Sequence, residues 1–420
     1  MRRLKNNIFL ILGGVLFAML LCEVGLRAAG ISYPMFSQID GEMGSSLRPG
    51  AEGWYHREGR AYVRINDAGL RDREHVLAKP DNTVRIAVLG DSYAEAVQVP
   101  MEDTFWSVLE REIKGCPRFD GREVEVINFG VSGYGTAQEL LMLRQRVWRY
   151  SPDIVLLAFV TGNDIRNNSR ALEQEGRKPY FIFKNGQLVA DLSFRESLGF
   201  RLRQTEVARS MYRIGNSSRL FQVFTEVQRI ALAPSAHANL HSIGIKTVNA
   251  AEKANNVEGS APAWDGYAEV GLDAAVYVEP QDPAWKEAWA VTEGLLRLMR
   301  DDVREKGADF LTVTLSNSPQ VHPDPAVRRA FEKRLGVPHL FYPDFRIRDL
   351  GQREGFAVLN LAPLFETVAG QQQMFLHGFD NSGLGKGHWN KEGHRLAGRL
   401  IAQELCPDLA NRVHSASPQM

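Results

Sequence analysis

The chain has 420 residues, and its 50 Lys and Arg are balanced by 50 Asp and Glu, which gives a formal net charge of zero. Such a chain lacks the basic excess that binding to nucleic-acid phosphates requires, so no nucleic-acid partner is expected. Hydrophobic residues make up 44% and charged residues 24%, as in ordinary globular domains, and this predicts a sizeable core. The length predicts two domains, or one large domain with an insertion.

The N-terminus combines a cationic start with an apolar run. Arg2, Arg3 and Lys5 precede residues 8–22, which carry no charge. A cleaved signal peptide and an uncleaved signal anchor both fit this pattern. We favour a transmembrane anchor, because the residues after the run form a poor cleavage site and because Glu23 can lie at the membrane interface. The basic residues would keep the N-terminus in the cytoplasm and place the rest outside, in the periplasm if the cell is Gram-negative.

Three cysteines occur. Cys22 lies in the apolar run, while Cys116 and Cys406 each precede a proline at the end of an expected helix. In an oxidising compartment the last two can form a disulfide, and otherwise they are two separate small apolar residues. The sequence leaves both possibilities open.

From residue 84 onward, short apolar strands alternate with amphipathic helices. Strands are expected at 84–89, 124–129, 153–160, 309–315 and 357–361. Helices are expected at 104–113, 137–150, 285–306, 346–354 and 394–405. Continuous apolar strands are typical of parallel sheets buried on both faces, and repeated βα units place helices on both sides. The predicted fold is therefore α/β, a three-layer α/β/α sandwich with a mostly parallel sheet.

The alternation is interrupted between residues 170 and 285. A hairpin around Asn185-Gly186 is followed by helical stretches and by a polar segment near 250–262, so we interpret this region as an insertion. Apolar residues at 220–230 are interpreted as the inner face of an insertion helix or, alternatively, as the lining of an acyl pocket. The expected divisions are an anchor at 1–30, an irregular lead-in at 31–80, a core at 81–169 and 286–408, the insertion at 170–285 and a tail at 409–420.

Four polar motifs stand at or beside the expected strand ends. They are Gly90-Asp91-Ser92, the glycine-rich stretch 128–135, Gly162-Asn163-Asp164 and His388-Trp389-Asn390. In open α/β sheets, ligands bind beyond the carboxyl ends of the strands. A serine on a strand-to-helix turn is exposed there, and the helix N-terminus behind it supplies backbone N–H groups and a favourable dipole for a developing anion. Each motif alone is weak, but their order, strand-end placement and spacing together are a strong signal.

In order and spacing, these motifs resemble those of the SGNH (GDSL-like) hydrolases. The resemblance rests on Gly90-Asp91-Ser92, Ser132-Gly133, Gly162-Asn163-Asp164, and His388 followed by Asn390 and Gly393-His394. It implies a flavodoxin-like sandwich with Ser92 as nucleophile and His388 as base. It also implies an oxyanion hole formed by the backbone N–H groups of Ser92 and Gly133 and by the side-chain amide of Asn163. Gly133 is preferred to Gly130 because the family's oxyanion glycine follows a serine-like position.

The third member of the expected triad is less evident. The family carries an Asp three residues before the histidine, and this chain has Gly385 there. Asp380, upstream in a glycine-rich loop, could orient the imidazole instead, or a backbone carbonyl could leave a Ser–His dyad. His377, His388 and His394 are not predicted to bind zinc, because the chain has neither a two-histidine helix motif nor paired metal-binding cysteines. No cofactor is expected.

The predicted function is that of a serine esterase or O-acyltransferase. Its substrate would be an acylated small molecule or carbohydrate, plausibly O-acetyl groups of a cell-envelope carbohydrate, and the enzyme would contact the membrane through its N-terminal helix. One alternative is a lipid-acting esterase or thioesterase. Another is a catalytically silent scaffold in polysaccharide assembly that keeps the fold but has lost the Asp.

Overall fold

The computed structural model describes residues 2–231 and 273–407, which form two compact units. One unit consists of residues 2–35 and 202–231, and the other of residues 36–201 and 273–407. Of the region interpreted as an insertion, residues 170–201 belong to the larger unit and residues 202–231 to the smaller one. The polar segment near 250–262 and the tail at 409–420 lie outside the described residues.

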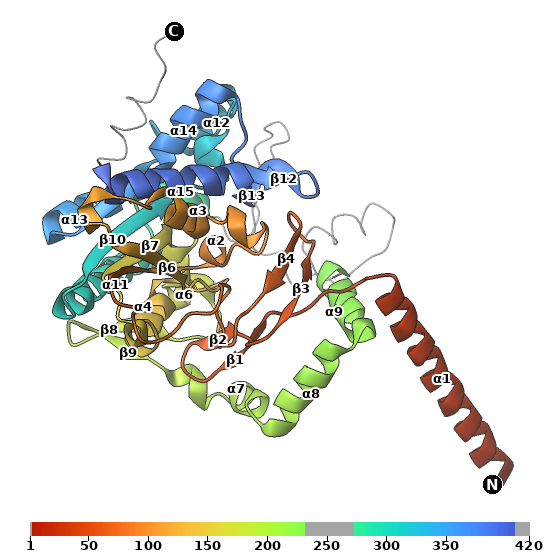
Figure 1. Cartoon of the computed structure of the whole chain (residues 1–420). Coiled ribbons are helices and arrows are strands. Elements are labelled where there is room, and N and C mark those ends of the chain that lie inside the picture. Colours follow the sequence, from red (N-terminus) through yellow and green to blue (C-terminus); the bar gives the residue numbers. More distant parts are fainter. Residues whose placement is uncertain (1, 232–272, 408–420) are drawn as a thin grey trace. The chain divides into compact units, whose positions relative to one another are not determined.

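A five-stranded parallel sheet forms the centre of the described part of the larger unit (Figure 1). Its strands are β5 (Thr83–Gly90), β6 (Glu123–Asn128), β7 (Ile154–Val160), β10 (Asp309–Leu315) and β11 (Ala357–Asn360). Their spatial order is β11-β10-β7-β5-β6. β5, which comes first in the chain among these five strands, therefore lies between β6 and β7. This is the flavodoxin-like order. The expected α/β/α fold is confirmed.

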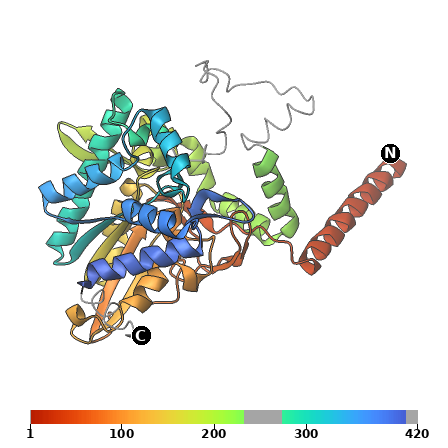
Figure 2. The same ribbon diagram turned by 90° about the horizontal axis from the view of Figure 1, so that it is seen from above.

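Helices cover both faces of this sheet. One face carries α3 (Phe105–Glu112), α14 (Leu361–Gln372) and α15 (Lys391–Leu405), which share one apolar cluster with Ile86 and Val88 of β5. α3 and α15 lie side by side in both views (Figures 1 and 2). The other face carries α4 (Thr136–Gln145), α11 (Pro283–Glu305) and α13 (Tyr342–Glu354). Successive strand residues point to opposite faces, which explains why the strands read as continuous apolar runs.

Smaller elements connect or flank these layers. The short helices are α2 (Ser92–Glu95), α5 (Asp164–Asn167), α6 (Arg170–Glu173), α7 (Leu198–Arg203) and α12 (Pro325–Leu335). The expected hairpin around Asn185-Gly186 is present as β8 (Tyr180–Lys184) and β9 (Gln187–Asp191). A further antiparallel pair, β12 (His377–Phe379) and β13 (Gly383–Trp389), occupies the stretch interpreted as a glycine-rich loop.

The lead-in segment is more ordered than the sequence indicated. It contains two antiparallel pairs, β1 (Ser37–Asp40) with β2 (Gly44–Leu47), and β3 (Glu52–Tyr55) with β4 (Ala61–Arg64). Each strand has four residues, which is too short for a clear period-two signal. The alternation is visible only in three dimensions, where Val63 is buried while Tyr62 and Trp54 are exposed.

Cys116 and Cys406 form a disulfide with their Cα atoms 6.0 Å apart. Cys116 lies a few residues after α3, and Cys406 directly follows α15. The bond therefore ties together the C-terminal ends of two helices that already pack against each other. Of the two possibilities left open by the sequence, the structure contains the paired one.

The smaller unit contains α1 (Arg2–Ala28), α8 (Glu206–Ser217) and α9 (Arg219–Ala231). Residues Asn6–Ala28 of α1 are long and apolar enough to cross a membrane, and none of this stretch is buried. In α9, part of the apolar set expected on an inner face points outward instead, while Leu220 and Val223 are half-buried. Phe224 and Val227 are exposed, whereas Gln222 and Glu226 are buried.

Candidate active site

Ser92 lies at the point where the strand order reverses. β5 is flanked by β6 on one side and β7 on the other, so the connections from β5 and from β7 diverge at this edge. Such a switch point is where open α/β sheets bind ligands. Gly90 ends β5, and a Cβ there would come within 2.9 Å of the Ala94 side chain. The glycine therefore lets the chain turn sharply into α2 and present the half-buried Ser92 hydroxyl.

The structure brings Ser92 and His388 into hydrogen-bond contact across 296 residues of sequence. Ser92 Oγ and His388 Nε2 are 2.8 Å apart. His388 lies near the end of β13, and its ring lies 4.9 Å from the Tyr93 ring, centroid to centroid. The Gly387 carbonyl accepts hydrogen bonds from Tyr93 Oη at 3.2 Å and from His377 Nδ1 at 2.7 Å. These contacts fix the backbone that carries the imidazole.

The other ring nitrogen of His388 contacts Glu58, a residue that sequence reasoning missed. His388 Nδ1 lies 2.6 Å from Glu58 Oε2, and the His388 backbone N–H donates to Glu58 Oε1 at 2.7 Å. Burial by itself would raise the Glu58 pKa, but the hydrogen bonds from His388 and its positive charge outweigh burial, so the pKa lies below its ordinary value. Glu58 is therefore a carboxylate at neutral pH. It holds the imidazole with Nδ1 protonated and Nε2 free to accept the serine proton.

Asp380 does not occupy the position expected for it. β12 and β13 pair with Phe379 opposite Gly383 and His377 opposite Trp389. Asp380 therefore lies in the exposed turn after Phe379, at the end of the pair away from Trp389. The expectation that Asp380 orients the ring is corrected, because Asp380 is exposed and the ring nitrogen Nδ1 of His388 contacts Glu58 instead.

Asn381, next to Asp380, instead holds the segment that carries Glu58. Its side-chain amide donates to the carbonyls of His56 at 3.0 Å and Gly59 at 2.9 Å, and its oxygen accepts from Gly59 N–H at 2.9 Å. Gly387 has φ +71°, and a Cβ there would collide with the Glu58 carboxylate. The β12–β13 pair thus contains His388 and also contacts the turn that contains Glu58.

Three N–H donors expected to form an oxyanion hole come from the loops at this edge. Within the described residues, the backbone N–H groups of Ser92 and Gly133 take part in no hydrogen bond. Gly133 has φ +81°, and its Cβ position is open. The N–H of Gly130 is not available in the same way, because it already donates to the Asn128 side chain. Gly130 is also closely packed, since a Cβ there would collide with Ala94. Gly133 is therefore the better candidate.

Asn163 follows β7, and its side chain is held in place by a hydrogen bond to Asp91. Its amide Nδ2 donates to Asp91 Oδ2 at 2.9 Å, and the same carboxylate accepts the Tyr93 N–H at 3.0 Å. A carboxamide nitrogen carries two N–H bonds, so one remains for a substrate oxygen. Asp91 thus braces both the serine turn and the asparagine.

Behind these loops lie three buried carboxyl groups, those of Asp91, Glu139 and Asp164. Burial raises the pKa of each carboxyl group. The negative charge of Asp91 raises the pKa of Glu139 further, and the charges of Glu139 and Asp91 raise that of Asp164, so both lie well above their ordinary values. Asp164 accepts the Val160 N–H at 2.7 Å, whereas neither oxygen of Glu139 has a hydrogen-bond partner in the described structure. Glu139 is therefore expected to be protonated at neutral pH.

The remaining histidines near the site have structural contacts. His377 Nε2 contacts Ser316 Oγ at 3.0 Å, and His394 Nδ1 accepts the Phe105 N–H at 3.3 Å. Burial lowers the pKa of His377 to about 4 and that of His394 to about 3, so both are neutral. Trp389 is buried and donates to Ser316. Among the residues described, no group of acidic, histidine or cysteine side chains could hold a metal ion.

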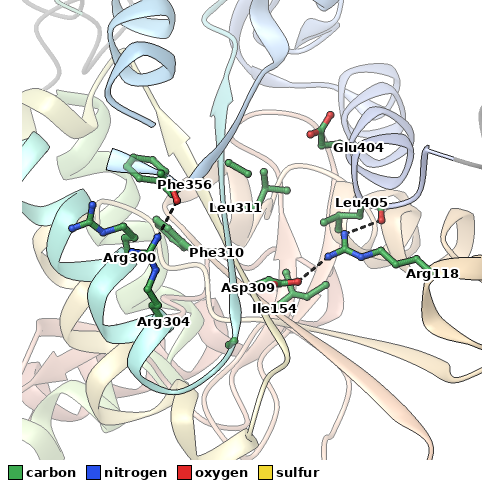
Figure 3. A pocket seen from close by; sticks show the side chains of 13 residues that line it. Arg118, Ile154, Arg300, Arg304, Asp309, Phe310, Leu311, Phe356, Glu404 and Leu405 are labelled. Carbon is green, nitrogen blue, oxygen red and sulfur yellow. Dashed lines mark hydrogen bonds and ion pairs between the residues drawn. The ribbon is translucent and has the colours of Figure 1, made fainter. Parts of the chain in front are cut away.

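A cavity of about 410 Å³ lies at the opposite edge of the sheet, where β7 and β10 begin (Figure 3). Two of its arginines are already paired, Arg118 with Asp309 and Arg300 with Glu354, each at 2.8 Å. Its lining residues, all in the described part of the chain, include no serine, cysteine or histidine. It therefore contains neither a serine or cysteine nucleophile nor a histidine base.

A second cavity, of about 710 Å³, borders the β3–β4 hairpin that presents Glu58. Its lining includes the exposed rings of Trp54 and Tyr62 together with Arg60, Arg64 and Arg73. The Arg60 guanidinium lies 5.1 Å from the centre of the Trp54 ring, and the Trp54 and Tyr62 rings meet edge to face at 5.6 Å. This cavity thus combines flat aromatic surfaces with hydrogen-bond donors.

No family model matches the chain, and no curated protein matches its sequence. An acetylxylan esterase from Geobacillus stearothermophilus is similar in structure, with 11% identity, a TM-score of 0.36 and coverage of 77% of this chain and 94% of its own. A protein described as lipolytic, of the G-D-S-L family, from Desulfitobacterium hafniense has 10% identity, a TM-score of 0.32 and coverage of 76% and 98%. These likenesses are too distant to assign an activity to this chain.

Proposed function

We propose that this protein is a serine esterase or O-acyltransferase that works through an acyl-enzyme on Ser92. The observation that carries the proposal is the continuous contact Ser92–His388–Glu58, with distances of 2.8 Å and 2.6 Å. A serine hydroxyl becomes a useful nucleophile when a neighbouring base removes its proton and a third group orients that base. The contact to Glu58 also removes the main reason for the silent-scaffold alternative, which was the missing Asp.

In the proposed mechanism, Ser92 Oγ attacks the ester carbonyl while His388 Nε2 takes its proton. The resulting oxyanion accepts hydrogen bonds from the Ser92 and Gly133 N–H groups and from the Asn163 amide. His388 then donates the proton to the leaving alcohol, which departs as the carbonyl reforms. Water, or a hydroxyl of an acceptor, next attacks the acyl-enzyme with His388 again acting as base, and Ser92 is released with its proton restored.

We further propose a carbohydrate substrate, supported by the cavity beside the β3–β4 hairpin. Aromatic faces pack against the C–H faces of sugar rings, and guanidinium groups donate hydrogen bonds to sugar oxygens. Arg60, which lines this cavity, is two residues from Glu58. A sugar on Trp54 and Tyr62 would thus lie beside the hairpin that completes the triad.

We also propose that α1 anchors the chain in a membrane with the larger unit outside the cytoplasm. Two observations support this arrangement. α1 has an unburied apolar stretch of 23 residues with a cationic start, and the larger unit contains a disulfide. Disulfides persist in oxidising compartments such as the periplasm, and basic residues are retained on the cytoplasmic side.

The deciding experiment is active-site labelling of the full chain with a fluorophosphonate probe. Wild type should be labelled at Ser92, and Ser92→Ala and His388→Ala should not, while Asp380→Ala should label like wild type. A folded wild-type protein that resists the probe would favour the scaffold alternative. Release of acetate from acetylated xylooligosaccharides, with a higher KM for Trp54→Ala, would support the carbohydrate proposal. Exclusive turnover of long-chain esters would support the lipid-acting alternative instead.

A further inference from the structure

α8 has an exposed apolar face. Val207, Met211 and Ile214 follow the spacing i, i+4, i+7 and therefore lie on one side of the helix. Their exposed fractions are 70%, 68% and 70%. The opposite side of α8 makes the internal contacts: Asn216 is buried and accepts the Met35 N–H at 3.0 Å, and Tyr212 Oη lies 3.7 Å from Met35 Sδ.

α9 shows the same inverted pattern. Phe224 and Val227 are 56% and 58% exposed, while Gln222 and Glu226 on the other side are buried. Gln222 accepts the Tyr33 N–H at 2.9 Å and donates to the Asn216 carbonyl at 2.6 Å. A hairpin of helices in water normally buries its apolar residues and exposes its polar ones. Here, within the described part of the smaller unit, the arrangement is reversed.

The start of α9 is hydrogen-bonded to Glu23, near the C-terminal end of α1. The Glu23 carboxylate accepts the N–H groups of Arg219 and Leu220, both at 3.0 Å, and the Ser218 hydroxyl at 3.0 Å. Arg27 completes the junction by donating to the Ser217 carbonyl at 2.7 Å. One carboxylate near the end of α1 therefore caps the start of α9.

The length of the apolar run indicates where this junction lies. Residues 8–22 rise about 22 Å at roughly 1.5 Å per residue, which is shorter than the roughly 30 Å hydrocarbon core of a bilayer. If α1 spans the membrane, Glu23 and the α9 cap lie at the depth of the headgroups. The exposed apolar faces of α8 and α9 would then begin at the same depth (the elements are labelled in Figure 1).

The charges fit a membrane surface as well. Arg209 and Arg213 are exposed on the side of α8 away from the apolar stripe, and Arg209 is ion-paired with Glu206 at 3.1 Å. Arg229 is exposed near the end of α9. Helices that lie in the plane of a membrane typically combine an apolar face with arginines or lysines that contact anionic headgroups.

We propose that α8 and α9 form a second membrane contact, a pair of helices that lie in the lipid interface with Val207, Met211, Ile214, Phe224 and Val227 toward the acyl chains. This inference rests on the proposed anchoring by α1 and goes beyond it. The chain would be held at two places, a spanning helix and an in-plane helical hairpin, joined rigidly through Glu23.

The test uses the full chain in vesicles of phosphatidylcholine and phosphatidylglycerol, in a Cys22→Ser background that keeps the Cys116–Cys406 disulfide. Single cysteines at Leu16, Met211, Phe224 and Arg213 carry an environment-sensitive fluorophore. We expect brominated lipid to quench emission at 16, 211 and 224, with a blue shift, and aqueous iodide to quench emission at 213. Arg213 is the matched control for Met211, because it lies on the same helix outside the stripe.

Each outcome separates the two proposals. Iodide quenching at 211 and 224 equal to that at 213 would overturn the interfacial helices, and so would protection from both quenchers, which would indicate a protein cover. If 16 escapes lipid quenching while 211 and 224 do not, the spanning anchor fails and the in-plane contact stands. Fluorophosphonate labelling of the same samples reports the catalytic proposal independently.

Discussion

The two halves of the candidate site are supported in different ways. Ser92, Gly133 and Asn163 follow strands of the central sheet, whose core is continuous and fully buried. Glu58 lies in the turn between two four-residue strands outside that sheet. This turn is held by hydrogen bonds to the Asn381 side chain and to the backbone N–H of His388. The proposed nucleophile and oxyanion donors are therefore fixed by packing, whereas the orientation of the proposed base depends on a few polar contacts. The predictions below test this difference from its largest expected effect to its smallest.

The largest effect is expected for Glu58→Gln. The variant keeps the shape of the side chain but cannot favour the tautomer with Nδ1 protonated, so kcat should fall by about 10²–10⁴-fold with little change in KM. Steady-state hydrolysis of an activated acetyl ester measures this. The control is Glu52→Gln, an exposed carboxylate at the start of the same hairpin. Equal activity of Glu58→Gln and wild type would mean that the chain works as a Ser–His dyad.

On the core side, Asn163→Ala should lower kcat by about 10²–10³-fold, the usual effect of losing one oxyanion donor. Ser132→Ala is the matched control, because the side chain of Ser132 is exposed and its backbone N–H is already occupied by Glu95 at 2.6 Å. Labelling by fluorophosphonate should slow in parallel with kcat for Asn163→Ala. An unchanged labelling rate would remove Asn163 from the oxyanion hole.

A smaller loss is expected for Asn381→Ala, which removes three hydrogen bonds to the backbone of the Glu58 turn. At about 0.5–1.5 kcal/mol each, partly replaced by water, these bonds predict a loss of about 3- to 30-fold in kcat. Because Asn381 acts through Glu58, the double variant with Glu58→Gln should be no slower than Glu58→Gln alone. Asp380→Ala, at the neighbouring exposed position, should behave like wild type. Additive losses in the double variant would contradict the positioning role.

The smallest effect concerns stability on the core side. A raised pKa means that folded Glu139 holds its proton more tightly than unfolded Glu139, so its stabilising contribution is complete below about pH 4.5 and is lost as the pH rises toward the folded pKa. Glu139→Gln cannot titrate and should lose stability less steeply with rising pH. Each pKa unit of the shift corresponds to about 1.4 kcal/mol. Urea unfolding between pH 5 and pH 9 measures this, and identical slopes for the two proteins would contradict a buried protonated carboxyl.

The strand-end half of the site could be predicted because its signals are local. The strands β5 and β7 are continuous apolar runs, and Ser92 and Asn163 follow them directly, so the parallel arrangement alone brings them to one edge. His388 could be predicted from its motif beside the last helix. A pattern of buried strands suffices here because packing enforces it.

Glu58 could not be predicted in this way. It lies between strands of four residues, which are too short to give a period-two signal in the sequence. Asp380 was the carboxylate expected to orient the ring, because it is near His388 in the sequence. The pairing of β12 with β13 decided between them by turning Asp380 to solvent and opening space at Gly387 for the Glu58 carboxylate.

The sequence by itself therefore determined the sheet, its helices and the residues at the strand ends, because hydrophobic periodicity within each element is enough to specify them. The tertiary structure decided which carboxylate meets the imidazole, that Cys116 pairs with Cys406, and that the apolar faces of α8 and α9 point outward. Those outcomes depend on contacts between segments as many as 330 residues apart. The sequence pattern within one element cannot predict such contacts.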